Sequence, residues 1–316
     1  MSKVLITGGA GFVGSHLVDR FLSDNKNHEI IILDNFSIGR HNLKVLNSKD
    51  IRIIEGDIES NETYNTIPND IDLIIHLAAM NRAPRSIKDP IKSNEINITG
   101  TLKLLEFSRK NNCKFVFVSS SSVFGHLKIM PRPEETNEFL PSHPYGLGKM
   151  ASEHYCRLYS ELYDLDTRII RYFAVYGPRQ SPELTYSAVI PKFIKASLKN
   201  EPITIFGGDQ SRNFTFVKDT VEATFLLATA KKCKHQVYQV SGKEKITIEK
   251  LAAYVEEISN KKIERIYKDL PQGGIFESVA DMKNLKTDFN FLPRVSFIDG
   301  LKETYTWFQT NSEYFI

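Results

Sequence analysis

The feature that most constrains the fold is a glycine-rich turn at the start of the chain. An apolar, strand-forming run covers Lys3 to Thr7, and TGGAGFVG follows it with glycines at positions 8, 11 and 14. The next residues, SHLVDRFL, repeat apolar side chains at helical spacing and predict a helix over Gly11–Ser23. Strand, glycine turn and helix in this order are typical of a dinucleotide-binding unit, whose helix start presents backbone N–H groups to a pyrophosphate.

The three glycines have separate expected roles. Gly8 permits the tight turn, Gly11 lets the backbone approach a pyrophosphate, and Gly14 lets the helix pack against its strand. The spacing is G-x-x-G-x-x-G, so the triplet alone also fits an ordinary strand-to-helix turn. Asp34 favours the nucleotide interpretation, because it directly follows a second apolar strand, Ile30 to Leu33. A carboxylate there accepts hydrogen bonds from both ribose hydroxyls and repels a 2′-phosphate, so we expect NAD rather than NADP.

Strand and helix patterns alternate through the first half of the chain. We expect strands at Lys3–Thr7, Ile30–Leu33, Ile51–Glu55, Asp72–His76, Lys114–Ser119 and Thr167–Phe173, with helices at Gly11–Ser23, Pro90–Asn111 and Pro144–Tyr163. This alternation predicts an α/β fold, a Rossmann-type doubly wound parallel sheet with helices on both faces. Polar residues follow several of these strands, where ligands bind in open parallel sheets.

The pattern changes after Gly177, where proline and glycine become frequent. We expect strands at Ile203–Phe206, Asn213–Val217 and Gln236–Val240, and helices at Asp219–Lys231, Ile248–Asn260 and Phe297–Gln309. We therefore predict an NAD-binding domain over residues 1–176, to which part of 209–240 returns, and a smaller, interleaved substrate domain over residues 177–316.

Composition narrows the possible partners and location. The net charge is only +3 with 25% charged residues of both signs interspersed, so no concentrated basic face for nucleic acid is expected. The apolar runs are too short to span a bilayer, and a strand from residue 3 leaves no room for a signal peptide. The three cysteines, Cys113, Cys156 and Cys233, lack metal-ligand spacing. We expect free thiols in the cytoplasm and no metal site.

Tyr145 and Lys149 are the candidate proton-transfer residues. They stand four apart at the start of a helix that Pro144 introduces, so they share one face, as a plain surface pair also would. Four serines, Ser119–Ser122, follow a strand about two dozen residues earlier and can supply a hydroxyl. We expect the Lys149 ammonium to lower the pKa of Tyr145 toward working pH, which would suit proton transfer while NAD exchanges hydride.

These stretches resemble the extended short-chain dehydrogenases/reductases of the NAD-dependent epimerase/dehydratase family, and are most similar to nucleotide-sugar 4-epimerases. The resemblance extends over nearly the whole chain. It rests on TGGAGFVG, DNFSIGR from Asp34, HLAA from His76, PRSIKDPIKSNEINITGTLKLLE from Pro84, SSSSVFG from Ser119, YGLGK from Tyr145, RYFAVYGPRQ from Arg171, VIPKFI from Val189 and ITIFGGDQSRNFTFV from Ile203.

The resemblance implies a role for each matching position. Catalysis falls to Ser120, Tyr145 and Lys149. The implied cofactor residues are Gly8, Gly11, Phe12, Val13, Gly14, Asp34, Asn35, Ser37, Gly39, Asp57, Ile58, Leu77, Ala78, Ala79, Asn97, Ser119, Tyr145, Lys149 and Tyr172. The implied substrate residues are Arg85, Ser86, Ser120, Tyr145, Ala174, Val189, Phe206, Arg212 and Ser278, with Arg212 on the diphosphate.

Departures from the family pattern point to the reaction. Ser121 and Ser122 stand where family dehydratases place an Asp-Glu pair, so dehydration is disfavoured. Ala174 replaces an asparagine that helps to bind the nucleotide-sugar phosphates, and Phe276 replaces a second diphosphate arginine. Ser278 aligns with the size gate for the sugar 2-substituent and leaves room for an N-acetyl group.

The sequence thus predicts an NAD-dependent nucleotide-sugar 4-epimerase, most simply for a UDP-sugar of polysaccharide biosynthesis. Uronate decarboxylation or net reduction of a keto-sugar is the alternative within the family, and a non-catalytic protein is disfavoured by the intact Tyr145–Lys149 pair. His76 is expected to be structural. Arg82 and Arg85 either meet a phosphate or sugar carboxylate or are solvated loop charges. Apolar residues on several sides of two long helices predict a homodimer through a four-helix bundle, as the resemblance implies.

Overall fold

A seven-stranded parallel sheet forms the centre of the computed structural model, which describes residues 2–26, 28–44, 51–182, 188–269 and 277–311. The strand order is β11-β6-β5-β4-β1-β2-β3. The strands are β1 (Lys3–Thr7), β2 (Glu29–Asp34), β3 (Ile51–Glu55), β4 (Leu73–His76), β5 (Lys114–Ser120), β6 (Thr167–Tyr172) and β11 (Val237–Val240). The chain starts in the middle and builds outward in both directions, which confirms the expected doubly wound fold.

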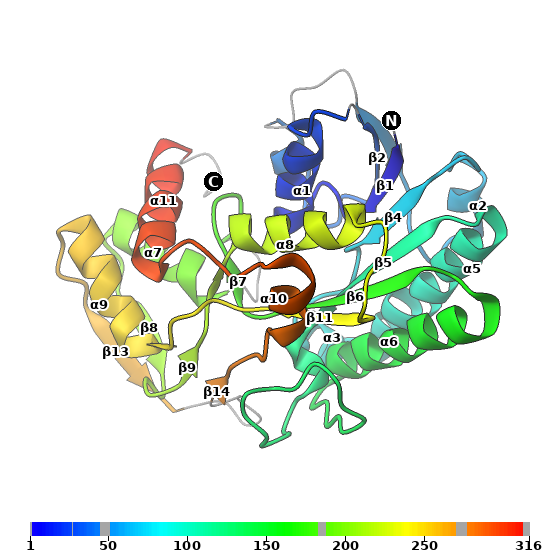
Figure 1. The fold of residues 1–316 in the computed structure, drawn as a ribbon. Helices are drawn as coiled ribbons and strands as arrows, with labels where there is room; N and C mark the ends of the chain where they lie inside the picture. The colour runs from blue at the N-terminus through cyan, green and yellow to red at the C-terminus, as the bar shows by residue number, and fades with distance from the viewer. Residues whose placement is uncertain (1, 27, 45–50, 183–187, 270–276, 312–316) are drawn as a thin grey trace.

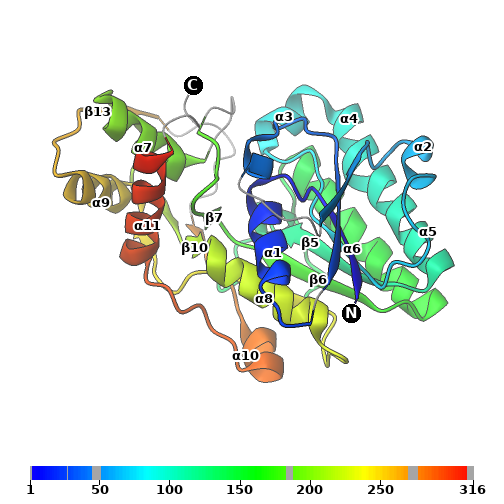
Figure 2. The same ribbon diagram turned by 90° about the horizontal axis from the view of Figure 1, so that it is seen from above.

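Helices cover both faces of this sheet (Figures 1 and 2). The helices α1 (Phe12–Leu22) and α8 (Val217–Thr229) pack side by side on one face, and α5 (Thr101–Asn111) and α6 (Pro144–Tyr163) cover the other. Along β1, Val4 and Ile6 belong to the core on the α1 side and Leu5 to the core on the α5 side. Strands buried on both faces explain why the sequence shows continuous apolar runs instead of alternation.

One predicted helix is irregular. The run expected as a continuous helix over Pro90–Asn111 consists of α4 (Pro90–Asn94), a π-helical stretch η2 (Glu95–Gly100) and α5. Asn97 lies in the π-helical stretch, and its side chain bonds the backbone N–H and carbonyl of Met80 at 2.9 and 3.2 Å. The wider turn therefore coincides with a contact that holds the loop after β4, as π-bulges often do near functional sites.

The remaining elements lie mainly to one side of the sheet (Figure 2). They include α7 (Val189–Lys199), α9 (Ile248–Ser259) and α11 (Phe297–Thr310) with the strand pair β8 (Ile203–Phe206) and β13 (Arg265–Lys268). Short strands β9 (Ser211–Arg212), β12 (Ile246–Thr247) and β14 (Glu277–Ser278) form a three-stranded sheet, and β7 (Val175–Tyr176) pairs with β10 (Thr215–Phe216). The strand expected at Asn213–Val217 is shorter in the structure, because only Thr215–Phe216 is strand, as β10, and Val217 begins α8.

Short elements connect these layers. They are η1 (His41–Lys44), α2 (Asn61–Tyr64), α3 (Ala83–Lys88), η3 (Ser121–Val123) and α10 (Lys283–Phe289), which lies beside β11. Cys113, Cys156 and Cys233 are free thiols, as expected. Within the described ranges, no helix is long and apolar enough to cross a membrane.

Candidate functional site

The glycine turn forms the floor of a cavity of about 280 Å³ at the carboxyl ends of β1, β2 and β4. Gly8 has a φ of +73°, and a Cβ added there would lie 2.8 Å from the backbone nitrogen of Ala78. A Cβ added to Gly14 would lie 2.2 Å from the carbonyl oxygen of Gly8. The backbone of the turn is therefore packed too closely against the loop after β4 and against α1 for any side chain.

Asp34 lies on the wall of this cavity. Its carboxylate accepts backbone hydrogen bonds from Ala10 at 3.0 Å and Phe36 at 2.9 Å, while burial raises its pKa. The Asn35 side chain donates a 2.6 Å hydrogen bond to Asp57, which follows the neighbouring strand β3. Of the residues expected to bind NAD, those that line this cavity are Gly8, Gly11, Asp34, Asn35, Ser37, Gly39, Asp57, Ile58, Leu77, Ala78 and Ala79.

Buried hydrogen bonds fix the loop that closes this cavity. His76 is fully buried and lies between the hydroxyls of Thr7, at 2.7 Å from Nδ1, and Thr101, at 3.0 Å from Nε2. Thr7 also accepts from the backbone N–H of Ala78, and Thr101 donates to the carbonyl of Asn97. Burial lowers the pKa of His76 well below its ordinary value, so it stays neutral. We infer that His76 positions the cofactor loop and is not a base.

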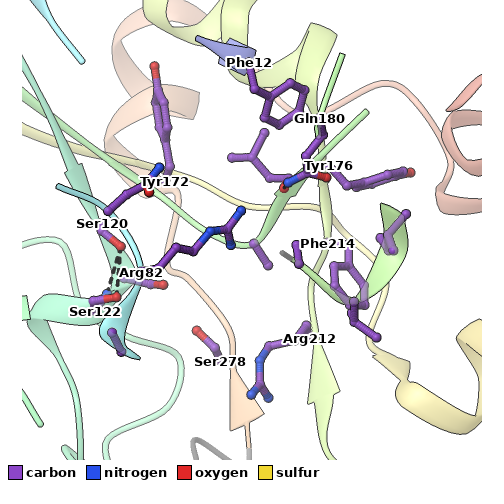
Figure 3. Close-up of a pocket in the computed structure, with 18 of the residues that line it drawn as sticks. Phe12, Arg82, Ser120, Ser122, Tyr172, Tyr176, Gln180, Arg212, Phe214 and Ser278 are labelled. Atoms are coloured by element: carbon purple, nitrogen blue, oxygen red, sulfur yellow. Dashed lines mark hydrogen bonds between the residues drawn. The ribbon is translucent and has the colours of Figure 1, made fainter. Parts of the chain in front are cut away.

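A second, larger cavity of about 550 Å³ adjoins the first, and Asn81 lines both. Ser120 lies on its wall at the end of β5 and bonds Ser122, with the two hydroxyls 3.1 Å apart (Figure 3). Tyr145 lies in the first turn of α6, where His143 caps the helix by accepting from Gly146. The ring of Tyr145 stacks on that of His143, with centroids 6.0 Å apart. The end of β5 and the start of α6 thus bring Ser120 and Tyr145 to the wall of the larger cavity.

The electrostatics of Tyr145 differ from the sequence expectation. Burial raises the pKa of Tyr145, and a hydrogen bond from Ser120 and the charge of Arg82 act in the opposite direction. Lys149 is not the group that offsets the burial, because its ammonium donates to the Val118 carbonyl at 2.7 Å and lies over the Phe117 ring. Burial lowers the pKa of Lys149 itself to about 7. The expectation that Lys149 lowers the pKa of Tyr145 is therefore wrong for this structure.

Arg82 is a further component of this wall. Its backbone has φ 77° and ψ 122°, a conformation that costs a non-glycine residue on the order of 1–3 kcal/mol. Its side chain extends from the side of Ser120 and Ser122 into the cavity (Figure 3), and its buried Nε has no hydrogen-bond partner among the described residues. Arg85, which the sequence groups with Arg82, lines the cofactor cavity.

The cavity also collects most of the residues expected at the substrate. Arg212, on β9, donates to its neighbour's carbonyl at 2.7 Å and enters from a different wall than Arg82. Ala174 has a φ of +41°, in the left-handed region that asparagine tolerates better than alanine. The expected substrate residues that line this cavity are Ser120, Tyr145, Ala174, Val189, Phe206, Arg212 and Ser278. Phe12, Val13 and Tyr172, which the resemblance assigns to the cofactor, line this cavity and not the smaller one.

Several other expected residues lie behind the walls of both cavities. Ser86 is fully buried and donates to the Ala83 carbonyl at 2.8 Å within α3, and Ser119 donates to the buried Glu153 at 2.5 Å. Asn97 and Lys149 bond backbone groups, and Gly14 faces the carbonyl of Gly8. These residues position the walls in this structure. Phe276 lies outside the described residues.

Sequence reasoning gave no role to several residues that line the larger cavity. Tyr176 and Gln180 belong to the quoted RYFAVYGPRQ stretch, and Gln210 and Phe214 to the ITIFGGDQSRNFTFV stretch. The motifs therefore located the segments, but their spacing did not reveal which side chains face inward. Within the part of the chain that the structure describes, no group of three or more His, Cys, Asp or Glu side chains could hold a metal ion.

Comparison with known proteins finds relatives that match this chain over most of its length. The family model described as the NAD dependent epimerase/dehydratase family matches residues 4–241. A putative UDP-glucose 4-epimerase of Methanocaldococcus jannaschii is 32% identical, over 98% of this chain and 99% of its own length. A UDP-N-acetylglucosamine 4-epimerase from Methanobrevibacter ruminantium M1, solved with UDP-N-acetylmuramic acid, superimposes with a TM-score of 0.91 at 37% identity, over 98% of both chains.

A further solved structure contains both a nucleotide sugar and NAD. The UDP-glucuronic acid 4-epimerase from Bacillus cereus, in complex with UDP-glucuronic acid and NAD, superimposes with a TM-score of 0.87 at 31% identity. The match covers 98% of this chain and 99% of that chain.

Proposed function

The chain belongs to the NAD-dependent epimerase/dehydratase family, and we propose that it is an NAD-dependent 4-epimerase of nucleotide sugars, with a UDP-sugar as substrate. The observation that carries this proposal is the placement of Ser120 and Tyr145 on the wall of a 550 Å³ cavity that adjoins the glycine-turn cavity. Such an arrangement lets one sugar hydroxyl meet an acid/base group beside a dinucleotide.

The smaller cavity fits NAD by the chemistry of its walls. A side chain at Gly8 would collide with the backbone of Ala78, and one at Gly14 with the carbonyl of Gly8, so the turn keeps its backbone bare for a phosphate group. Asp34 provides a carboxylate for ribose hydroxyls at the end of β2. Bound NAD supplies the hydride acceptor and donor of an epimerisation, so the reaction involves no net redox change.

Tyr145 acts as the acid/base in the proposed reaction. It removes the proton from the sugar 4-hydroxyl as the 4-keto sugar forms, and it returns a proton when the opposite face is reduced. Because burial raises its pKa, the phenol is protonated in the free enzyme, and the hydrogen bond from Ser120 and the Arg82 charge favour its ionisation. Ser120 donates a hydrogen bond to the reacting sugar oxygen at the same wall.

The substrate groups follow from the remaining walls. Arg212 binds the diphosphate, and Val189 and Phe206 pack along the nucleotide end of the cavity. Ser278, a small residue on the wall, leaves room for an N-acetyl group on the sugar. Ser121 and Ser122 also line the cavity and carry no carboxylate that could expel water, which disfavours dehydration.

The proposed enzyme is a cytoplasmic homodimer that serves polysaccharide biosynthesis. The support for a dimer is a set of exposed apolar side chains on α3, α4 and α6, among which Ile91 is 74% and Leu162 64% exposed. The free thiols fit a reducing compartment. Sedimentation at micromolar concentration is expected to give a dimer, and a monomer there would contradict this part of the proposal.

The activity is tested by incubating the protein with UDP-hexoses, UDP-N-acetylhexosamines and UDP-hexuronates, followed by chromatographic separation of the products. We expect the 4-epimer of at least one sugar, without net change in NADH absorbance and without release of carbon dioxide. Carbon dioxide from a uronate would favour the decarboxylase alternative, and consumption of added NADH would favour a reductase. No conversion of any sugar by the NAD-loaded protein would contradict the proposal.

A further inference from the structure

The larger cavity has an unbalanced set of charges. Among the described residues that line it, Arg82 and Arg212 are cationic, and none is Asp, Glu or Lys. His143 is held neutral at ordinary pH because burial lowers its pKa. The diphosphate of a nucleotide sugar can pair with Arg212 at one end of the cavity. Because that diphosphate carries two negative charges, the case for a further anion rests on where the second cation, Arg82, lies.

Arg82 is built into the reacting wall. Arg82 and Tyr145 both line the larger cavity, and the Arg82 charge favours ionisation of the phenol, which lowers the pKa of Tyr145 against the effect of burial. The side chain extends into the cavity from the side of Ser120 and Ser122 (Figure 3). Since Tyr145 and Ser120 serve the sugar 4-hydroxyl in the proposed function, Arg82 lies where the hexose ring binds.

Among the described residues, no carboxylate forms an ion pair with the Arg82 guanidinium. Its Nε is buried without a hydrogen-bond partner among those residues. A desolvated guanidinium with an unused N–H group is costly unless a ligand pairs with it. The strained backbone at φ 77° adds a second cost at the same residue. Both costs are explained if a ligand anion completes the site.

We propose that Arg82 binds a carboxylate carried by the hexose, so that the substrate is an acidic nucleotide sugar. This inference rests on the proposed 4-epimerase function, and it names the substrate class of that site. The planar guanidinium can pair with a carboxylate through two parallel N–H···O bonds, one of them from Nε. Ser121 and Ser122 leave the same wall free of acidic side chains that would repel such a group.

A sugar carboxylate can have two sources, C6 of a uronic acid or an acid substituent such as the lactyl group of a muramic acid. Two matched substrate pairs separate them. UDP-glucuronate is compared with UDP-glucose, and UDP-N-acetylmuramate with UDP-N-acetylglucosamine, by the ratio of kcat/KM within each pair. In the wild type we expect the acidic member of one pair to be preferred by at least tenfold.

The Arg82→Gln variant is expected to lower that preference about thirtyfold, the usual size of a charge-assisted hydrogen bond. Arg82→Lys keeps the positive charge but cannot form the two parallel hydrogen bonds, so it should restore part of the preference for the acidic sugar. The control is Lys88→Gln, which removes an exposed charge of α3 that lines neither cavity and should leave the ratio unchanged. A purely structural role for Arg82 would lower kcat/KM equally for both members, and that result would overturn the proposal.

A binding measurement separates failure of this inference from failure of the proposed function. In the Tyr145→Phe background, calorimetry with UDP-glucuronate and UDP-N-acetylmuramate should show weaker binding after Arg82→Gln, with a smaller change for the neutral sugars. Loss of that Arg82 dependence in an enzyme that epimerises neutral sugars would refute the inference and leave the function intact. Arg82-dependent binding without any epimerisation would support the inference and refute the function.

Discussion

The two cavities of this molecule are built in different ways. The cofactor cavity lies at the ends of β1, β2 and β4, where close backbone packing at Gly8 and Gly14 sets the shape of its glycine turn. The substrate cavity is made of side chains from segments spread between Phe12 and Ser278, and its chemistry depends on where each of them points. The first kind of site tolerates few changes of shape, whereas the second can change specificity through single side chains.

Removal of the proposed acid/base hydroxyl of Tyr145, which lines the substrate cavity, should give the largest effect. Tyr145→Phe is expected to lower kcat about 10³- to 10⁴-fold while bound NAD is retained, because the phenol hydroxyl moves the proton and does not line the cofactor cavity. Turnover and NAD content are measured on the same preparation. A variant with near-normal kcat would remove Tyr145 from the mechanism.

The cofactor cavity is tested by two glycine variants whose added Cβ atoms would meet different degrees of crowding. Gly14→Ala should destabilise the fold, because its Cβ would lie 2.2 Å from the Gly8 carbonyl oxygen. Gly11→Ala meets only that oxygen, at 3.1 Å, so the protein should fold but bind NAD more weakly, by about tenfold or more. Thermal unfolding and NAD titration measure the two effects. Equal loss of stability in both variants would contradict the distinction.

The sequence predicted the positions of residues in the cofactor cavity better than those in the substrate cavity, for a physical reason. Strand periodicity and glycine spacing are local properties, so β1, Asp34 and the HLAA stretch were placed correctly from the residues. The sequence groups Arg82 and Arg85 together, either on a phosphate or sugar carboxylate or as solvated loop charges, yet in the structure they line different cavities. The π-helical turn at Asn97 and the Lys149–Val118 contact likewise depend on tertiary neighbours that no spacing reveals.

Lys149, which is buried and lines neither cavity, gives a pH-dependent prediction for the NAD-free protein. Its pKa is about 7 in the fold against an ordinary 10.5, so the unfolded chain binds more protons between these values and stability rises with pH. Denaturant unfolding should show a gain of about 2 kcal/mol from pH 7 to 9 that Lys149→Met lacks. If the wild type and Lys149→Met gained the same free energy of unfolding between pH 7 and 9, Lys149 would be charged in the folded protein.

The smallest expected effect concerns Ala174 on the substrate cavity. Its φ of +41° suits asparagine better than alanine, so Ala174→Asn should raise the free energy of unfolding by about 0.5–1 kcal/mol. Chemical denaturation measures this change, with Ala188→Asn, which has a φ of −64°, as the control without that gain. A loss of stability in Ala174→Asn would mean that this wall has no room for the amide.

The most direct test of the account follows deuterium placed at C4 of a nucleotide sugar that the enzyme converts. If the two cavities act together, with Tyr145 moving only the hydroxyl proton beside bound NAD, the label is removed and returned within one closed site. The product should then carry the deuterium at the inverted C4, with no exchange into solvent. Replacement of the label by solvent hydrogen would contradict the central claim that this enzyme inverts C4 through a hydride stored on NAD.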